Sequence, residues 1–331
     1  NELSEDFPPF VLIFDDYHLI SSPEIHQALT YILEHQPAQM HLAIATRADP
    51  PLPLSRLRVR DQLLEIRESD LRFTREEAGE FFSQVMDLNL KAGQITALER
   101  RTEGWAAGLQ LAALSLQEQD DKAQFVEEFA GSNRYILDYL GQEVLDQLEQ
   151  EVREFLLQTS ILDRLNGPLC ETATRIPNSQ EILEDLEANH LFILALDQER
   201  TWYRYHRLFK EYLLKTLHIE KPGLDVELHL RASSWFHQQG NLDEAITHAL
   251  AAEDHKRVIN LIDEVALQKL QRSETSSLLR WIEALPEDVI EQHPTLCLTH
   301  AWALILRGGP LEKVESRLAI IEQGSGNDRL L

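Results

Sequence analysis

The spacing of apolar residues changes near residue 74, and this change constrains the fold more than any other feature of the sequence. Before that point, Phe10–Phe14 is a continuous apolar run, typical of a strand buried on both faces of a parallel sheet. Residues 41–45 read as a second strand. Beyond residue 74 most apolar residues recur at helical spacing. The pattern predicts a mainly α protein with an N-terminal α/β part, residues 1–73.

A helix is expected between the two strands, because Ser22 suits an N-cap and Pro23 suits the first helical position. A strand, a helix and a strand in this order make one right-handed crossover unit. A third strand is predicted at residues 63–66, near the end of the α/β part.

Two domains are expected in the middle of the chain. Thr74 and Glu77 have the spacing of a capping box and begin a helical domain, residues 74–133. Residues 134–220 combine helices, a strand pair and a helix, an order that predicts a winged-helix-like domain. The elements expected in these two domains are helices near 92–103, 104–117, 134–148, 150–158 and 179–188, strands near 191–196 and 202–205, and a last helix from about 207.

Residues 221–331 read as helix pairs, the start of a tetratricopeptide-like domain. Gly240 and Gly308 lie 68 residues apart, twice the ~34-residue period of tetratricopeptide repeats. No glycine lies near residue 274, where a middle repeat would need its turn. The sequence therefore predicts an irregular helical solenoid rather than a strict repeat.

Composition narrows the class of function. The formal net charge is −25, so the chain by itself is a poor DNA binder, because DNA binding depends on cationic side chains. No apolar run approaches the ~20 residues that a membrane helix needs. Its two cysteines, Cys170 and Cys297, lie far apart and outside any metal-binding pattern, which is typical of a protein from the reducing cytoplasm.

The strongest candidate site follows the first strand. Asp15 and Asp16 come directly after the apolar run, as the carboxylates of a Walker B element do in nucleotide hydrolases. Ligands of open α/β sheets bind at the carboxyl ends of the strands, where one carboxylate can hold the water shell of Mg²⁺ and a second can orient an attacking water. The alternative is a solvated acidic turn after a buried strand.

The second strand ends in Thr46 and Arg47, at the same edge of the sheet as Asp15. A polar or cationic side chain there can sense the terminal phosphate, and the guanidinium fork of arginine suits phosphate oxygens. The alternative for Arg47 is a surface arginine paired with Asp49.

Two further candidates are cationic or titratable. Arg58, which alternates with two other arginines, is expected either at a cationic edge facing phosphates or beside acids such as Glu65. His206 ends the second wing strand, where a lone histidine more often has a structural role. The motifs GxSxG and HExxH are absent from the sequence.

Several stretches together resemble one family, the MalT-like regulators of the STAND class of signal-transducing ATPases. Four of them resemble its nucleotide-binding domain, a P-loop NTPase sheet followed by helices, one resembles its winged-helix signature and one the opening of its helical sensor domain. In that order they are residues 12–20 with 25–26, then 57–66, 71–74 and 104–111, then 205–209, and then 245–252.

The resemblance implies a cytoplasmic switch, closed with ADP, and open and self-associating with ATP, that is at most a slow ATPase. It implies that an inducer binds the helical repeats. Asp15 would serve Mg²⁺ with Asp16 beside it, Arg47 would sense the phosphate, and His206 would reach the ADP phosphates. Many members end in a LuxR-type helix-turn-helix, through which the parent would contact DNA and RNA polymerase.

The sequence departs from the family in lacking the phosphate loop, since no glycine in the chain is followed by lysine. The chain is therefore expected to be an internal fragment that lacks this loop and the helix-turn-helix, and to be inactive as an ATPase alone. Two alternatives stay open: a non-enzymatic helical scaffold for protein interaction, and a STAND switch with a different output domain, such as a kinase or cyclase.

Overall fold

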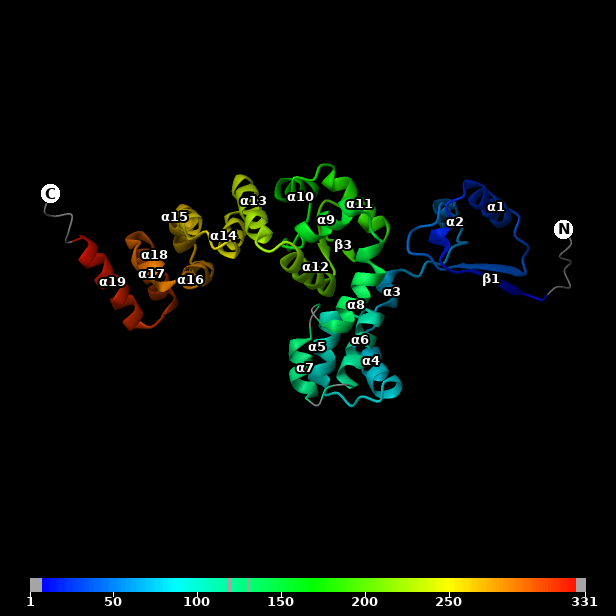
Figure 1. Ribbon diagram of the computed structural model, residues 1–331, viewed down its shortest axis with the longest axis horizontal. Coiled ribbons are helices and arrows are strands. Elements are labelled where there is room, and N and C mark those ends of the chain that lie inside the picture. Colours follow the sequence, from blue (N-terminus) through cyan, green and yellow to red (C-terminus); the bar gives the residue numbers. More distant parts are fainter. Residues whose placement is uncertain (1–7, 118, 120, 130, 132, 326–331) are drawn as a thin grey trace. The chain divides into compact units, whose positions relative to one another are not determined.

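The computed structural model describes residues 8–117, 119, 121–129, 131 and 133–325. The chain divides into two compact units. The first comprises Asn1–Glu149 and Gln180–Tyr212, and the second comprises Gln150–Ser179 and Leu213–Leu331. Helices dominate both units, so the expected mainly α fold with an N-terminal α/β part is confirmed (Figure 1). No described helix is both long and apolar enough to cross a membrane.

The α/β part of the first unit contains the expected strand, helix and strand. The strands β1 (Phe10–Phe14) and β2 (Met40–Ile44) are parallel, and α1 (Pro23–Glu34) connects them. The register sets the last residues of the two strands opposite each other. The two carboxyl ends therefore meet at one edge of the sheet.

Two expectations for this part are wrong. The strand β1 is not buried on both faces, because Val11 is 58% and Ile13 69% exposed, and within the described residues β1 pairs with β2 alone. Residues 63–66 form no strand. Glu65, inside this segment, binds the side chains of Arg58 and Arg67, so ion pairs take the place of a strand ladder.

Helices make up the rest of the first unit. The predicted capping box at α4 (Arg75–Glu80) is confirmed, since Thr74 Oγ1 accepts from the Glu77 N–H at 3.2 Å and the Glu77 carboxylate accepts from the Thr74 N–H at 2.8 Å. The other helical elements of this unit before the wing are a 3-10 turn (Tyr17–Leu19), α2 (Leu54–Val59), α3 (Glu68–Leu71), a π-helical turn (Phe81–Val85), α5 (Ala92–Thr102), α6 (Ala106–Gln117), α7 (Lys122–Glu128), α8 (Arg134–Glu143) and a 3-10 turn (Leu145–Gln147).

The wing is an antiparallel hairpin, as predicted. The strands β3 (Ile193–Ala195) and β4 (Tyr203–Tyr205) pair with Ile193 opposite Tyr205. The hairpin follows α11 (Ser179–Ala188) and leads into α12 (Arg207–Glu220). This order of elements is that of a winged-helix-like domain.

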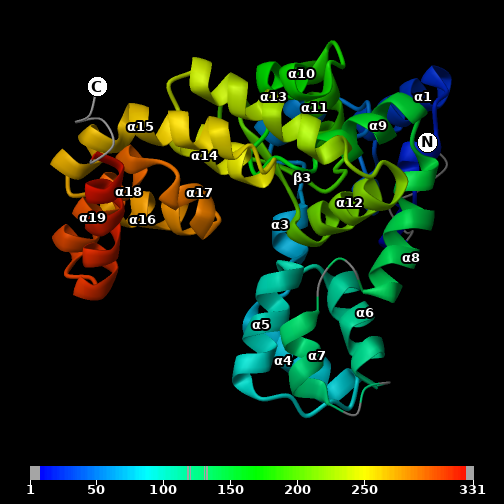
Figure 2. The ribbon, with the colours of Figure 1, turned by 60° about the vertical axis from the view of Figure 1, so that its left-hand side comes forward.

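The second unit consists of helices, most of them in pairs (Figure 2). Besides the last part of α12, they are α9 (Gln150–Thr159), α10 (Gly167–Thr174), α13 (Leu224–Gln238), α14 (Leu242–Ala251), α15 (His255–Gln271), α16 (Thr275–Glu283), α17 (Glu287–Glu291), α18 (Pro294–Arg307) and α19 (Leu311–Ser325). Gly240 and Gly308 lie in the turns of the first and last pairs with φ values of 74° and 71°. Between α15 and α16 the same left-handed conformation is taken by Ser273, with φ 59°. The middle pair is therefore present although its turn has no glycine.

Candidate functional site

The carboxyl ends of β1 and β2 are joined by backbone hydrogen bonds. The N–H of Ala45 donates to the carbonyl of Phe14 at 2.8 Å, and the N–H of Tyr17 donates to the carbonyl of Ala45 at 3.1 Å. These bonds hold Asp15 and Asp16, which follow β1, beside the residues that follow β2. The sheet edge predicted from the sequence is thus formed.

The two carboxylates at this edge face solvent. Asp16 adopts a left-handed backbone with φ 50°, and its N–H donates to the Asp15 carboxylate at 3.0 Å. Both side chains are exposed, whereas the next residue, Tyr17, is buried and its hydroxyl lies 2.8 Å from Nδ1 of His26. Tyr17 therefore anchors the turn and leaves the carboxylates accessible.

These residues fit Mg²⁺, which binds proteins through one or two carboxylates and keeps several waters. Within the described part of the chain, no group of three or more His, Cys, Asp or Glu side chains could enclose a metal ion. Asp15 and Asp16 would hold such an ion together with phosphate oxygens, and they supply the hard oxygen ligands that it prefers.

A cavity of about 430 Å³ adjoins the end of β2. Thr46 and Arg47 line it together with the neighbouring His18. The N–H of Arg47 lies 3.4 Å from His18 Nδ1, while its guanidinium is exposed and has no ion pair among the described residues. The rest of the lining consists of Tyr17, Ile20, Ala48, Asp49, Pro50, Pro51, Glu143, Val144, Gln147, Leu148, Asn189 and Leu191.

Arg58 is engaged elsewhere and does not line this cavity. Its guanidinium makes two hydrogen bonds of 2.8 Å to the carboxylate of Glu65. Hydrogen bonds from Arg58 and then from Arg67 lower the pKa of Glu65 to about 2. Arg67 also binds Asp49, the residue that the sequence offered as a partner for Arg47.

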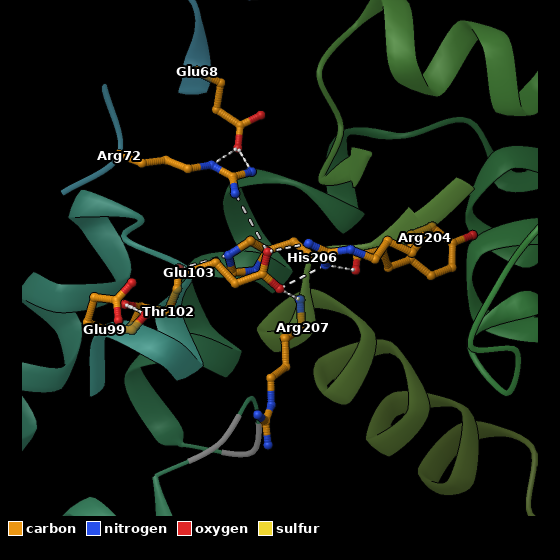
Figure 3. Close-up of polar contacts among 9 residues, drawn as sticks. Glu68, Arg72, Glu99, Thr102, Glu103, Arg204, His206 and Arg207 are labelled. Atoms are coloured by element: carbon orange, nitrogen blue, oxygen red, sulfur yellow. Dashed lines mark hydrogen bonds and ion pairs between the residues drawn. The ribbon is translucent and has the colours of Figure 1, made fainter. Parts of the chain in front are cut away.

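His206 lies apart from the cavity, at the junction between α5 and α12 (Figure 3). It is 4% exposed, and its Nε2 lies 2.9 Å from the carbonyl oxygen of Thr102. Since a carbonyl only accepts, Nε2 carries the proton, and within the described part of the molecule Nδ1 has no partner. Burial lowers the pKa of His206 below its ordinary 6.5, while the Glu103 carboxylate acts in the opposite direction. Burial therefore favours the neutral form of the imidazole.

The segment that contains the wing and His206 matches a known family. Residues 141–225 match the model of the MalT winged helix domain. Over 303 residues the chain is 39% identical to the HTH-type transcriptional regulator MalT of Yersinia enterocolitica, covering 91% of this chain and 34% of that protein. The chain is MalT-like. The resemblance read from its sequence is confirmed.

Other proteins contain a similar MalT-like segment. MalT of Klebsiella pneumoniae is 38% identical over 305 residues, which cover 92% of this chain and 34% of that protein. The serine/threonine-protein kinase PknK of Mycobacterium tuberculosis is 34% identical over 310 residues, 94% of this chain and 28% of the kinase. The chain thus spans about a third of the length of the curated relatives it matches. The crystal structure of a STAND protein with a tetratricopeptide repeat sensor from Pyrococcus horikoshii matches 94% of this chain and 43% of its own, with a TM-score of 0.45 and 18% identity.

One residue at the junction of the MalT-like chain was missed by sequence reasoning. The Glu103 carboxylate, 15% exposed, accepts hydrogen bonds of 2.9 Å from both Nη atoms of Arg204 and one of 3.1 Å from the N–H of Arg207 (Figure 3). Arg72 lies 3.7 Å away. Burial acts to raise the pKa of Glu103, but the hydrogen bonds from Arg204 and its positive charge act in the opposite direction, and the pKa lies below its ordinary value. No local sequence signal marks Glu103, because its main partner is 101 residues away.

Proposed function

We propose that this MalT-like chain is the switch segment of a nucleotide-dependent regulator of transcription, closed with ADP, and open and self-associating with ATP. The observation that carries the proposal is the edge where β1 and β2 end, where two exposed carboxylates directly precede Tyr17, which lines the cavity together with Thr46 and Arg47. This combination suits a nucleotide whose phosphates are accompanied by Mg²⁺. MalT-like relatives support the regulatory role.

Each residue at the edge has a distinct task in this proposal. Asp15 holds the hydrated Mg²⁺, which neutralises phosphate charge when it is bound, and Asp16 orients the attacking water. Thr46 and Arg47 receive the terminal phosphate, and the guanidinium of Arg47, which has no ion pair among the described residues, is available to bind it. Arg58 would have to leave Glu65 before it could reach a phosphate, so we assign it a secondary role.

The proposed domains divide the work along the chain. Residues 1–73 bind nucleotide with the support of 74–133, residues 134–220 form the winged helix that carries His206, and residues 221–331 begin the sensor that receives an inducer. With a net charge of −25, these residues are not expected to bind DNA. DNA and RNA polymerase would be contacted through a further domain of the regulator, in the cytoplasm.

The output need not be transcription. Both a transcriptional regulator and a protein kinase match more than nine-tenths of this chain. This favours a switch that serves different output domains, of which a kinase is the second candidate. A scaffold that binds no nucleotide is the remaining alternative.

Asp15→Asn tests the proposal in the full-length regulator. The substitution removes the charge that would hold Mg²⁺, yet Asp15 is exposed and its one described hydrogen bond is local, so the fold should be unaffected. We expect Mg-ATP binding and hydrolysis to fall at least tenfold, with a melting temperature close to that of the wild type. Asp61→Asn is the matched control, since Asp61 is an exposed aspartate of the same α/β part that lies outside the edge where β1 and β2 end. Unchanged nucleotide handling in Asp15→Asn would favour the scaffold.

A further inference from the structure

A cavity of about 320 Å³ lies among the last helices of the second unit. Its lining comes from α16, α17, α18 and α19, and α18 packs against the other three (Figure 2). Pockets that bind ligands generally span about 300–1,000 Å³, so this volume suits a small molecule.

At this cavity, His300 of α18 presents a buried N–H without a partner. His300 is 1% exposed, and its Nδ1 lies 3.1 Å from Nε of Arg317. Because a guanidinium only donates, Nδ1 accepts this hydrogen bond, and the proton of the neutral imidazole is on Nε2. Burial and then the charge of Arg317 lower the pKa of His300 below its ordinary 6.5, which favours the neutral form. Nε2 has no hydrogen-bond partner in the described part of the chain, so His300 offers a donor to an acceptor in the cavity.

The charged groups of the lining form one close pair and one distant pair. Nη2 of Arg317 donates to the Glu287 carboxylate at 2.9 Å, and Nη1 lies 2.7 Å from its other oxygen. By contrast, Oε1 of Glu283 lies 3.8 Å from Nζ of Lys313 and 4.0 Å from Nε2 of His300, and both distances are too long for a hydrogen bond. Arg317 therefore holds the imidazole in place, while Glu283 and Lys313 are open to a ligand.

A ligand with both a negative and a positive group matches this lining. The two cations and the two carboxylates cancel, so a simple anion would be attracted by Lys313 and Arg317 and repelled by Glu283 and Glu287. A zwitterion gains from both signs of charge. Its negative group belongs at the buried donor of His300, and its positive group at Glu283, whose side chain is 48% exposed.

We propose that this cavity binds a small amino acid with an apolar side chain. Its carboxylate accepts from Nε2 of His300 and pairs with Lys313, and its ammonium group pairs with Glu283. Its side chain contacts Leu285 and Ile290, the two apolar residues of the lining. The proposal goes beyond the proposed function and depends on it only for any regulatory consequence of binding.

Three ligands of the same shape test the site in this chain. L-leucine carries both charged groups, isocaproate lacks its ammonium group, and isopentylamine lacks its carboxylate. We expect L-leucine to bind at least tenfold more tightly than either of the other two, measured by isothermal titration calorimetry. The experiment involves no nucleotide, so its failure is distinct from a failure of ATP binding at Asp15.

Glu283→Gln separates the two charged groups of the ligand. The substitution removes the partner of the ammonium group, so the affinity for L-leucine should fall at least tenfold while that for isocaproate should not fall. Glu315→Gln is the matched control, since Glu315 is an exposed glutamate of α19 outside the lining, and this variant should bind L-leucine like wild type.

His300→Phe keeps a ring and removes the donor, so the affinities for L-leucine and isocaproate should both fall at least tenfold. Should this buried variant fail to fold, Lys313→Gln, at a side chain 59% exposed, is expected to weaken both ligands to a smaller extent. The proposal is overturned if L-leucine does not bind or binds no more tightly than isocaproate. It is also overturned if Glu283→Gln leaves the affinity for L-leucine unchanged, or if neither His300→Phe nor Lys313→Gln lowers it.

Discussion

The sheet edge and the α5–α12 junction present charge in opposite ways. At the edge, Asp15, Asp16 and Arg47 are exposed and make no ion pair among the described residues. At the junction, Glu103 and Arg204 satisfy each other across two segments far apart in sequence. Exposed, unpaired charges are available for a ligand at little cost, whereas paired charges must first be separated. The charges at the edge are therefore open to a ligand, whereas Glu103 and Arg204 at the junction are already occupied by each other.

The largest effect on the junction is expected from His206→Ala. The substitution removes the hydrogen bond to Thr102 and the packing of the ring against Trp105 and Phe192. We expect the free energy of unfolding to fall by about 3 kcal/mol, a value typical of a buried ring and a lost hydrogen bond. Chemical unfolding followed by circular dichroism measures it. His206→Gln, whose amide nitrogen can still reach the Thr102 carbonyl, should lose less than half as much.

The same substitution connects the junction to the switch. If the contact holds the closed state, His206→Ala in the full-length regulator should raise activity without inducer and speed the release of ADP. His206→Gln should stay close to wild type in both measurements. Equal basal activity and equal ADP release in all three proteins would make His206 a structural residue only.

Arg204→Ala should have the next largest effect. It leaves the Glu103 carboxylate with the N–H of Arg207 and a distant Arg72, so we expect a loss of about 2 kcal/mol, as for a hydrogen bond to a charged group. Arg207→Ala is the matched control. Among the described residues the Arg207 side chain pairs with Glu211 alone, in an exposed helical pair worth about 0.3–0.5 kcal/mol, and alanine keeps the backbone N–H of residue 207. Similar losses of unfolding free energy in Arg204→Ala and Arg207→Ala would show that Glu103 stabilises the fold no more than a surface charge does.

A change of pH is expected to have a smaller effect on the stability of the junction. The pKa of His206 is lowered by burial, so its contribution to stability is present above its ordinary value of 6.5 and is lost as pH falls through the lowered value. The pKa of Glu103 is also lowered, so its contribution is lost only at more acidic pH, below the ordinary 4.5. The difference in stability between wild type and His206→Gln, followed from pH 7.5 to about 4.5, isolates the first step. A difference independent of pH would show that His206 is not held neutral.

Local patterns predicted much of the fold. The first two strands, the crossover helix between them and the capping box of Thr74 each depend on neighbouring residues, and each was found where it was expected. The exposure of β1 and the missing strand at 63–66 depend instead on which other segments pack against them. The spacing of apolar residues carries no information about that. The middle helix pair could not be predicted from glycine spacing. Ser273 takes the left-handed conformation in its turn, so no glycine marks this repeat in the sequence.

The candidate sites divide in the same way. The carboxylates after β1 and the arginine after β2 were predictable, because parallel strands bring their carboxyl ends to one edge. The lining that residues 143–148 contribute to the cavity has no signal in the sequence. Neither has the Glu103–Arg204 pair, which joins the end of one helix to a strand 101 residues further along the chain. Such contacts follow from the folded arrangement and from nothing local.

The smallest effect on stability, and the sharpest test of the comparison, is expected from Arg47→Ala. The guanidinium of Arg47 is exposed, and its described hydrogen bond comes from the backbone N–H, which alanine retains. The free energy of unfolding should therefore change by less than about 0.5 kcal/mol.

In the full-length regulator, however, Arg47→Ala should weaken the binding of ATP, because it removes a charge-assisted contact to the terminal phosphate. The expected loss of binding energy is about 1.5–3 kcal/mol, roughly ten- to a hundredfold in affinity, and the binding of ADP should weaken much less. Competition binding of ATP against ADP measures this ratio. If Arg47→Ala weakens the binding of both nucleotides equally, Arg47 does not contact the terminal phosphate. If it lowers the free energy of unfolding as much as Arg204→Ala does, the side chain of Arg47 is engaged within the fold as that of Arg204 is.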